Sequence, residues 1–107
     1  MNNEEKAIGI NSLSEEEQYD CVVKHPWAIK YLNNQKEDLV MTAVKVNPKV
    51  LCLVREQTEE VCKCAVSLDY TTLAYVRELT DSIVEAAITV DQDAKYYLPE
   101  EWFTRFK

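Results

Sequence analysis

Apolar residues recur along this chain with a period of 22 residues. Three segments that begin one period apart, at Pro26, Pro48 and Tyr70, each carry two apolar residues spaced three apart. These pairs are Ile29 and Leu32, Leu51 and Val54, and Leu73 and Val76. Between the segments a second apolar set repeats in the same register: Leu39, Val40, Ala43, Val44; Val61, Cys62, Ala65, Val66; and Ile83, Val84, Ala87, Ile88. Because all of these positions keep one period, they indicate tandem structural repeats.

Each period predicts two short helices. The first begins at or near Pro26 or Pro48, since proline suits the first helical position. The second begins after Thr58 or Thr80, whose hydroxyl can cap a free backbone N–H, and its apolar set marks a broad buried stripe. The second helices end at residues that tolerate the turn conformations otherwise supplied by glycine: Asn47, Asp69 and Asp91. Such residues would explain how the chain folds with one glycine.

The two ends of the chain predict capping helices. Residues 14–24 predict a helix that corresponds to the second helix of a repeat. It opens with a capping box, Ser14 and Glu17, and its polar outer positions suit the end of a stack. At the other end Pro99 opens a last helix, whose aromatic residues we expect to close the core: Trp102, Phe103 and Phe106. We therefore predict an all-α fold, a short α-solenoid of two-helix repeats of about 22 residues. Residues 1–11 are expected to be flexible and residues 12–107 to form a single helical-repeat domain.

Composition and charge narrow the function. The chain has 107 residues, one domain by size, and its single glycine argues against a hairpin-rich β protein. The net charge is −7, and the first 20 residues contribute most of it. An acidic chain is repelled by phosphate, so we expect no direct nucleic-acid binding. No apolar run is long enough to span a bilayer and no secretory signal is visible, which predicts a cytoplasmic protein with reduced thiols.

Two stretches of the repeat resemble a known family. Residues 43–48 (Ala-Val-Lys-Val-Asn-Pro) and 75–80 (Tyr-Val-Arg-Glu-Leu-Thr) resemble an uncharacterised family of tandem helical repeats found in phages, large DNA viruses and bacteria, including secreted effectors. The likeness covers about residues 14–98, with departures at Lys36 and at Asp69-Tyr70. The resemblance implies a helical repeat protein in a viral, phage or effector setting, and hence the host cell cytoplasm. It implies no catalytic residue.

No pattern of residues points to catalysis or to a metal. His25, the one histidine, falls at a turn and has no obvious orienting partner in the sequence. Cys62 and Cys64 lie two apart, so on a helix they point in different directions and cannot share a metal. Cys62 and Cys21 align with small apolar residues, which predicts buried thiols. We therefore expect no enzyme activity, no cofactor and no metal.

The remaining candidates for function lie on the surface. Trp27 departs from the repeat, where Lys49, Thr71 and Asp93 hold the same position, so it is either an interface anchor or packs against the N-terminal cap. Arg55 and Arg77 either line a recognition ridge or pair with nearby glutamates. The predicted partner-binding residues are Trp27, Lys30, Arg55, Arg77 and Trp102.

These residues predict a non-catalytic module that binds another protein, a host factor that it inhibits or redirects. The alternative is an acidic mimic of nucleic acid that blocks the basic groove of a nucleic-acid-binding protein. Salt separates the two interpretations, because a charged interface weakens steeply with ionic strength and an apolar one does not.

Overall fold

A computed structural model describes residues 9–106 of the chain. Four α-helices of 10 residues each alternate with 3-10 helices of six residues. The α-helices are α2 (Glu15–Lys24), α3 (Glu37–Val46), α4 (Glu59–Leu68) and α5 (Asp81–Val90), and a shorter α6 (Glu100–Phe106) follows. The 3-10 helices are η1 (Pro26–Tyr31), η2 (Pro48–Leu53), η3 (Tyr70–Tyr75) and η4 (Gln92–Tyr97).

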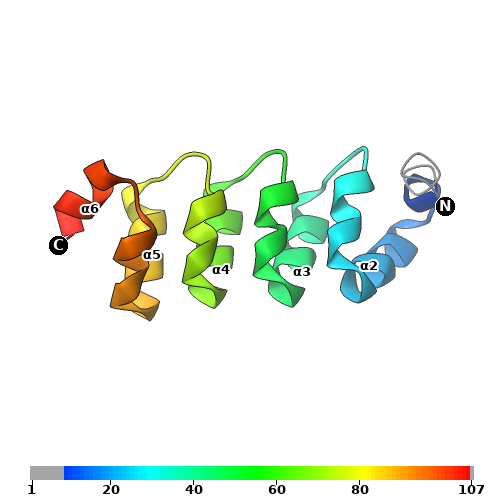
Figure 1. The fold of residues 1–107 in the computed structure, drawn as a ribbon. Coiled ribbons are helices and arrows are strands. Elements are labelled where there is room, and N and C mark those ends of the chain that lie inside the picture. Colours follow the sequence, from blue (N-terminus) through cyan, green and yellow to red (C-terminus); the bar gives the residue numbers. More distant parts are fainter. Residues whose placement is uncertain (1–8, 107) are drawn as a thin grey trace.

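The repeats stack in a row and form an elongated body of 48 × 21 × 19 Å. Each α-helix from α2 to α4 packs against the next α-helix, and each 3-10 helix packs against the next 3-10 helix, so the stack has two layers, while α6 packs against η4. The connections from each 3-10 helix to the following α-helix all lie along the upper side in Figure 1. The predicted all-α stack of 22-residue repeats is therefore confirmed. No helix in residues 9–106 is long and apolar enough to cross a membrane.

The first helix of each repeat is a 3-10 helix, and its apolar spacing is compatible with that geometry. A 3-10 helix has three residues per turn, so side chains at i and i+3 lie one above the other. Leu51 in η2 and Val54 just after it are both almost completely buried, and the N–H of Val54 donates to the carbonyl of Leu51 at 3.1 Å. A neighbouring column is buried as well and was not predicted: Val50, Thr72 and Ala94. The hydroxyl of Thr72 donates to the carbonyl of Asp69 at 2.7 Å, which satisfies its one polar group.

Asn47, Asp69 and Asp91 do end the α-helices, but the predicted reason was wrong. Their φ angles of −148°, −153° and −157° are extended, and no residue of the described chain has a positive φ. Each side-chain oxygen instead accepts the backbone N–H two residues later, at 2.9–3.1 Å, and so caps the next 3-10 helix. These residues therefore supply a capping hydrogen bond. They do not supply the left-handed backbone conformation that glycine favours, because their φ angles are extended.

The predicted N-caps of the α-helices are present. Ser14 and Glu17 form the capping box, with both bonds at 3.2 Å, and the hydroxyl of Thr58 accepts the N–H of Val61. The hydroxyl of Thr58 also donates to the carboxylate of Glu37 in the preceding repeat, at 3.1 Å. Thr80 and Glu59 repeat this contact at 2.8 Å, and Lys36 forms an ion pair with Glu15 at the corresponding place. The first acids of α2, α3 and α4 thus link neighbouring repeats as well as facing the helix dipole.

Two partly buried amides also join neighbouring repeats. The side chain of Gln35 donates to the carbonyls of Ile29 and Leu53, at 2.9 and 3.0 Å, and accepts the N–H of Arg55 at 2.8 Å. Gln57 makes the same three bonds one repeat later, to Leu51, Tyr75 and Arg77. We call this arrangement the amide clamp. It holds the loop of one repeat against the loop of the next.

The described N-terminal residues belong to the stack. Residues 9–11 form a helical turn, Ile10 is 5% exposed in the core, and Asn11 bonds to the carbonyl of Tyr31 and the N–H of Asn33. Residues 9–11, which fall in the segment 1–11 expected to be flexible, thus contact the stack, and Asn11 acts as a shorter amide clamp there. Residues 1–8 lie outside the described residues. At the C-terminal end Trp102 is partly buried in α6, and the side chains of Phe103 and Phe106 also lie outside the description.

Candidate functional site

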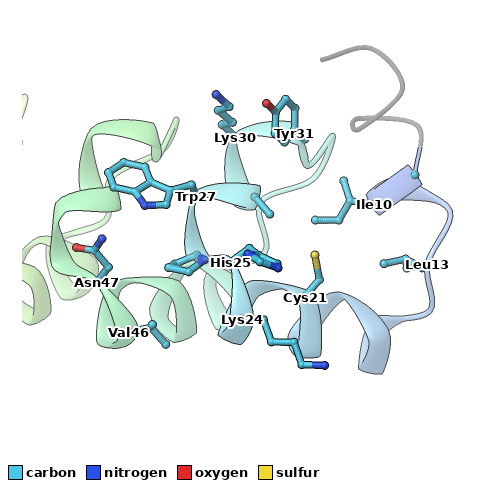
Figure 2. Close-up of a pocket in the computed structure, with 13 residues that line it drawn as sticks. Ile10, Leu13, Cys21, Lys24, His25, Trp27, Lys30, Tyr31, Val46 and Asn47 are labelled. Carbon is cyan, nitrogen blue, oxygen red and sulfur yellow. The ribbon is translucent and has the colours of Figure 1, made fainter. Parts of the chain in front are cut away.

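An open groove of about 1000 Å³ lies at the N-terminal end of the stack. The helical turn at residues 9–11, α2, η1 and the end of α3 surround it, as Figure 2 shows. We call it the N-terminal groove. Its lining residues are Gly9, Ile10, Leu13, Cys21, Lys24, His25, Pro26, Trp27, Ala28, Lys30, Tyr31, Val46 and Asn47.

Within residues 9–106, the groove coincides with a difference in packing between α2 and the later α-helices. Helices α3, α4 and α5 each pack between two 3-10 helices, whereas α2 packs only against η1 in this part of the chain. As a result Cys21 is partly exposed, although the residues at its repeat position are completely buried: Ala43, Ala65 and Ala87. The prediction that Cys21 is buried was wrong for this reason, while Cys62 is buried as predicted.

The groove combines an apolar floor with cationic side chains. Its apolar surface comes largely from Ile10, Leu13, Trp27, Tyr31 and Val46. Trp27 is 47% exposed, and Val46 is 49% exposed. An aromatic ring this open next to an apolar hollow is a common anchor for a binding partner.

Two lysines line the groove, Lys24 and Lys30, and none of its lining residues within residues 9–106 is a carboxylate. The ammonium of Lys30 lies 5.0 Å from the centre of the Tyr31 ring, a distance that allows a cation–π contact. Lys24 lies 3.6 Å from Asp20, but both side chains are well exposed and such a pair is weak. The groove is therefore locally positive in a chain whose net charge is −7.

Two departures from the repeat coincide with this groove. His25 stands where Asn47, Asp69 and Asp91 cap the following 3-10 helix, and its side chain makes no capping bond. Trp27 stands two residues later, at a position that is polar in each following repeat. Both departures therefore replace polar or acidic residues with aromatic ones at the rim.

The structure brings together two of the five predicted partner-binding residues. Trp27 and Lys30 both line the groove, and the exposure of Trp27 favours the anchor over packing against the N-terminal cap. Trp102 lies at the opposite end of the body. Arg55 and Arg77 lie outside the groove, and each guanidinium donates to carbonyls of the preceding loop: Arg55 to Leu32 and Asn33, and Arg77 to Arg55. These arginines therefore link repeats.

Several groove residues were not predicted. Ile10 was missed because residues 1–11 were expected to be flexible, and Val46 was missed because the end of α3 shows no departure from the repeat pattern. Cys21 and His25 were considered only as a buried thiol and as a turn residue. One signal in the sequence could have indicated the groove. His25 and Trp27, which both depart from the repeat pattern, lie only two residues apart.

The described residues show no arrangement typical of a metal or of an activated nucleophile. No group of three or more His, Cys, Asp or Glu side chains in this part of the chain could hold a metal ion. Cys52 and Cys64 do not line the groove with His25. Burial raises the pKa of the Cys62 thiol, with Glu59 adding to the rise and Arg77 opposing it, so this thiol is a poor nucleophile.

Comparison of the chain with protein-family models, with curated proteins and with solved structures gave no match. The resemblance to the tandem helical-repeat family of phages, viruses and effectors therefore stays a prediction.

Proposed function

We propose that this protein is a non-catalytic module that binds another protein through the N-terminal groove. The observation that carries the proposal is Trp27, an exposed aromatic ring beside an apolar hollow, at the one repeat where this position is not polar. Buried aromatic anchors provide much of the binding energy in protein interfaces. In a host cell such a module would inhibit or redirect the factor that it binds, as the family resemblance implies.

The body around the groove suits this role. The repeats are joined through the amide clamps and the contacts between α-helices, so the groove rests on a scaffold that many bonds hold in place. A preformed surface loses little conformational entropy when a partner binds, which favours affinity. Apolar residues at the edge of the groove, such as Val46, could extend the contact.

The experiment is capture of partners from host lysate on the immobilised full-length protein, followed by binding of the purified partner in a calorimeter. Trp27→Thr is the test variant, because Thr71 holds the same position in η3. Tyr96→Thr is the matched control, since Tyr96 is a 66% exposed aromatic residue near the other end of the stack. The proposal expects a partner whose affinity falls at least tenfold with Trp27→Thr and is unchanged with Tyr96→Thr. A partner that binds both variants and the wild type equally would refute it.

The acidic-mimic hypothesis has one observation in its favour. The first turns of α2, α3, α4 and α5 all carry acids, and these helices begin along the same side of the stack. Glu37 and Glu59 are engaged with the next repeat, however, and Lys36, Arg55 and Arg77 lie in the adjoining loops. A partner whose affinity falls steeply with salt concentration, and is the same for the wild type and for Trp27→Thr, would favour the acidic-mimic hypothesis.

A further inference from the structure

The charge around the N-terminal groove points to the chemistry of its occupant. The chain has 19 acidic residues and 12 Lys or Arg, yet among the described residues Lys24 and Lys30 line the groove and no acid does. A random sample of this sequence would place more acids than cations around such a hollow. The groove is thus a local exception to the charge of the whole protein.

The positive region continues for one repeat and then reverses. Lys45 precedes Val46 at the end of α3, and Lys49 holds the position of Trp27 in η2; both are exposed. The same side of the next two repeats carries Asp69, Asp91 and Asp93. A negatively charged segment would therefore be attracted to the N-terminal end of the stack and repelled further along it.

The arrangement of side chains suits a short peptide. In Figure 2, Trp27 and Val46 lie at one end of the groove, and Ile10 and Leu13 at the other. Lys30 and Lys24 lie on opposite sides of the hollow between these ends. A segment that runs along the floor could place an apolar side chain against Trp27 and carboxylates toward both lysines.

We propose that the N-terminal groove binds an acidic peptide segment of the protein partner, anchored by an apolar or aromatic side chain. This proposal rests on the proposed function and adds the chemistry of the bound segment. The pair between Lys24 and Asp20 is exposed and weak, so releasing Lys24 to a carboxylate of the partner costs little.

The test uses fluorescently labelled eight-residue peptides and the full-length protein, with binding followed by fluorescence polarisation. The acidic probe is Asp-Glu-Asp-Leu-Trp-Asp-Glu-Leu. Two relatives keep its apolar residues and replace every acid, one with Asn or Gln and the other with Lys. We expect the acidic probe to bind at least tenfold more tightly than the neutral one and the basic one not to bind. Equal binding of the acidic and neutral probes, or no saturable binding of the acidic probe up to 1 mM, would overturn the proposal.

Variants of the protein locate the binding. Lys24→Gln and Lys30→Gln should each weaken the acidic probe about threefold, the effect of an exposed ion pair, and leave the neutral probe unchanged. Lys95→Gln is the control, since Lys95 lies over the Tyr96 ring at the far end of the stack. Circular dichroism checks that each variant is folded. An effect of Lys95→Gln equal to that of Lys24→Gln would mean non-specific attraction and would overturn the proposal.

Other occupants give different results. Concentration-dependent dimers in sedimentation that vanish with Trp27→Thr would identify a second copy of this chain and contradict the proposal. Stronger binding of an eight-nucleotide single-stranded DNA than of the acidic probe would contradict it as well. A purified partner that depends on Trp27 but ignores both lysine variants would leave the proposed function standing and refute the acidic segment. Independence from Trp27 would refute the proposed function itself.

Discussion

Replacement of Gln57 by leucine tests whether the amide clamp holds the repeats together. The side chain of Gln57 donates to the carbonyls of Leu51 and Tyr75, at 3.1 and 2.9 Å, and accepts the N–H of Arg77 at 3.0 Å. Leucine is a suitable substitute, because Leu79 holds the same repeat position and is also partly buried. Gln57→Leu therefore removes these three hydrogen bonds, two of which reach the next repeat, together with a weak contact from the Cys62 thiol at 3.8 Å, and it retains a side chain of similar size.

The expected loss follows from the number and setting of these bonds. A typical hydrogen bond contributes about 0.5–1.5 kcal/mol net, and three of them would give about 1.5–4.5 kcal/mol. Water can reach some of the released groups, because Tyr75 and Arg77 are exposed, and leucine gains some apolar contact. We therefore expect a loss of about 2 kcal/mol in the free energy of unfolding, near the middle of the range for single substitutions and above that for a surface site.

The measurement is urea denaturation followed by circular dichroism at 222 nm. With a urea slope of about 1–3 kcal/mol per molar, a loss of about 2 kcal/mol moves the midpoint by roughly 1 M. Gln92→Leu is the matched control, since Gln92 is exposed in η4, and its midpoint should stay within about 0.5 kcal/mol of the wild type. A loss below about 0.5 kcal/mol for Gln57→Leu would show that the amide clamp contributes little, and the reasoning would fail.

Four further results are expected from single measurements. Thr58→Val removes an N-cap and the bond to the preceding repeat and should cost about 1–2 kcal/mol in the same denaturation experiment, whereas Leu51→Ala opens a cavity in the core and should cost about 2–5 kcal/mol. In the native protein iodoacetamide should modify the exposed Cys52 well before the buried Cys62, as peptide mass spectrometry would show. Because burial raises the pKa of Cys62, the thiol keeps its proton in the folded state at a pH where the unfolded chain loses it. The contribution of Cys62 to the free energy of unfolding is therefore full below about pH 9 and falls above it. Cys62→Val should reduce this alkaline loss, and an unchanged alkaline slope would contradict the assignment to Cys62.

The sequence predicted the fold well because the repeat constrains many positions at once. The register placed the α-helices and their buried stripes, and the capping residues Ser14, Thr58 and Thr80 were identified by type. The sequence did not distinguish α from 3-10 in the first helix of each repeat. An i, i+3 pair occurs on both kinds of helix, and only the six-residue length between two extended residues decides between them.

The candidate site was harder to predict, because the groove lies where α2 packs against one described 3-10 helix and the later α-helices pack against two. Trp27 was recognised as a departure from the pattern, but its neighbours belong to three other segments: the turn at Ile10, helix α2 with Cys21, and the end of α3 at Val46. Repeat analysis shows which positions are equivalent. It does not show how completely other parts of the fold cover the side chain at each of those positions.

The same geometry explains why the candidate site lies at the N-terminal end. In the later repeats, the residue equivalent to His25 is Asn or Asp, whose side-chain oxygen caps the 3-10 helix. The residue equivalent to Trp27 is polar, and its backbone N–H donates to that oxygen. Cys21 likewise holds a position that must be small and buried wherever another 3-10 helix packs against it. Within residues 9–106, no second 3-10 helix packs against α2, and these positions are less tightly covered. Aromatic side chains can then occupy two of them at little cost to the stack, so the groove tolerates residues that the inner repeats exclude.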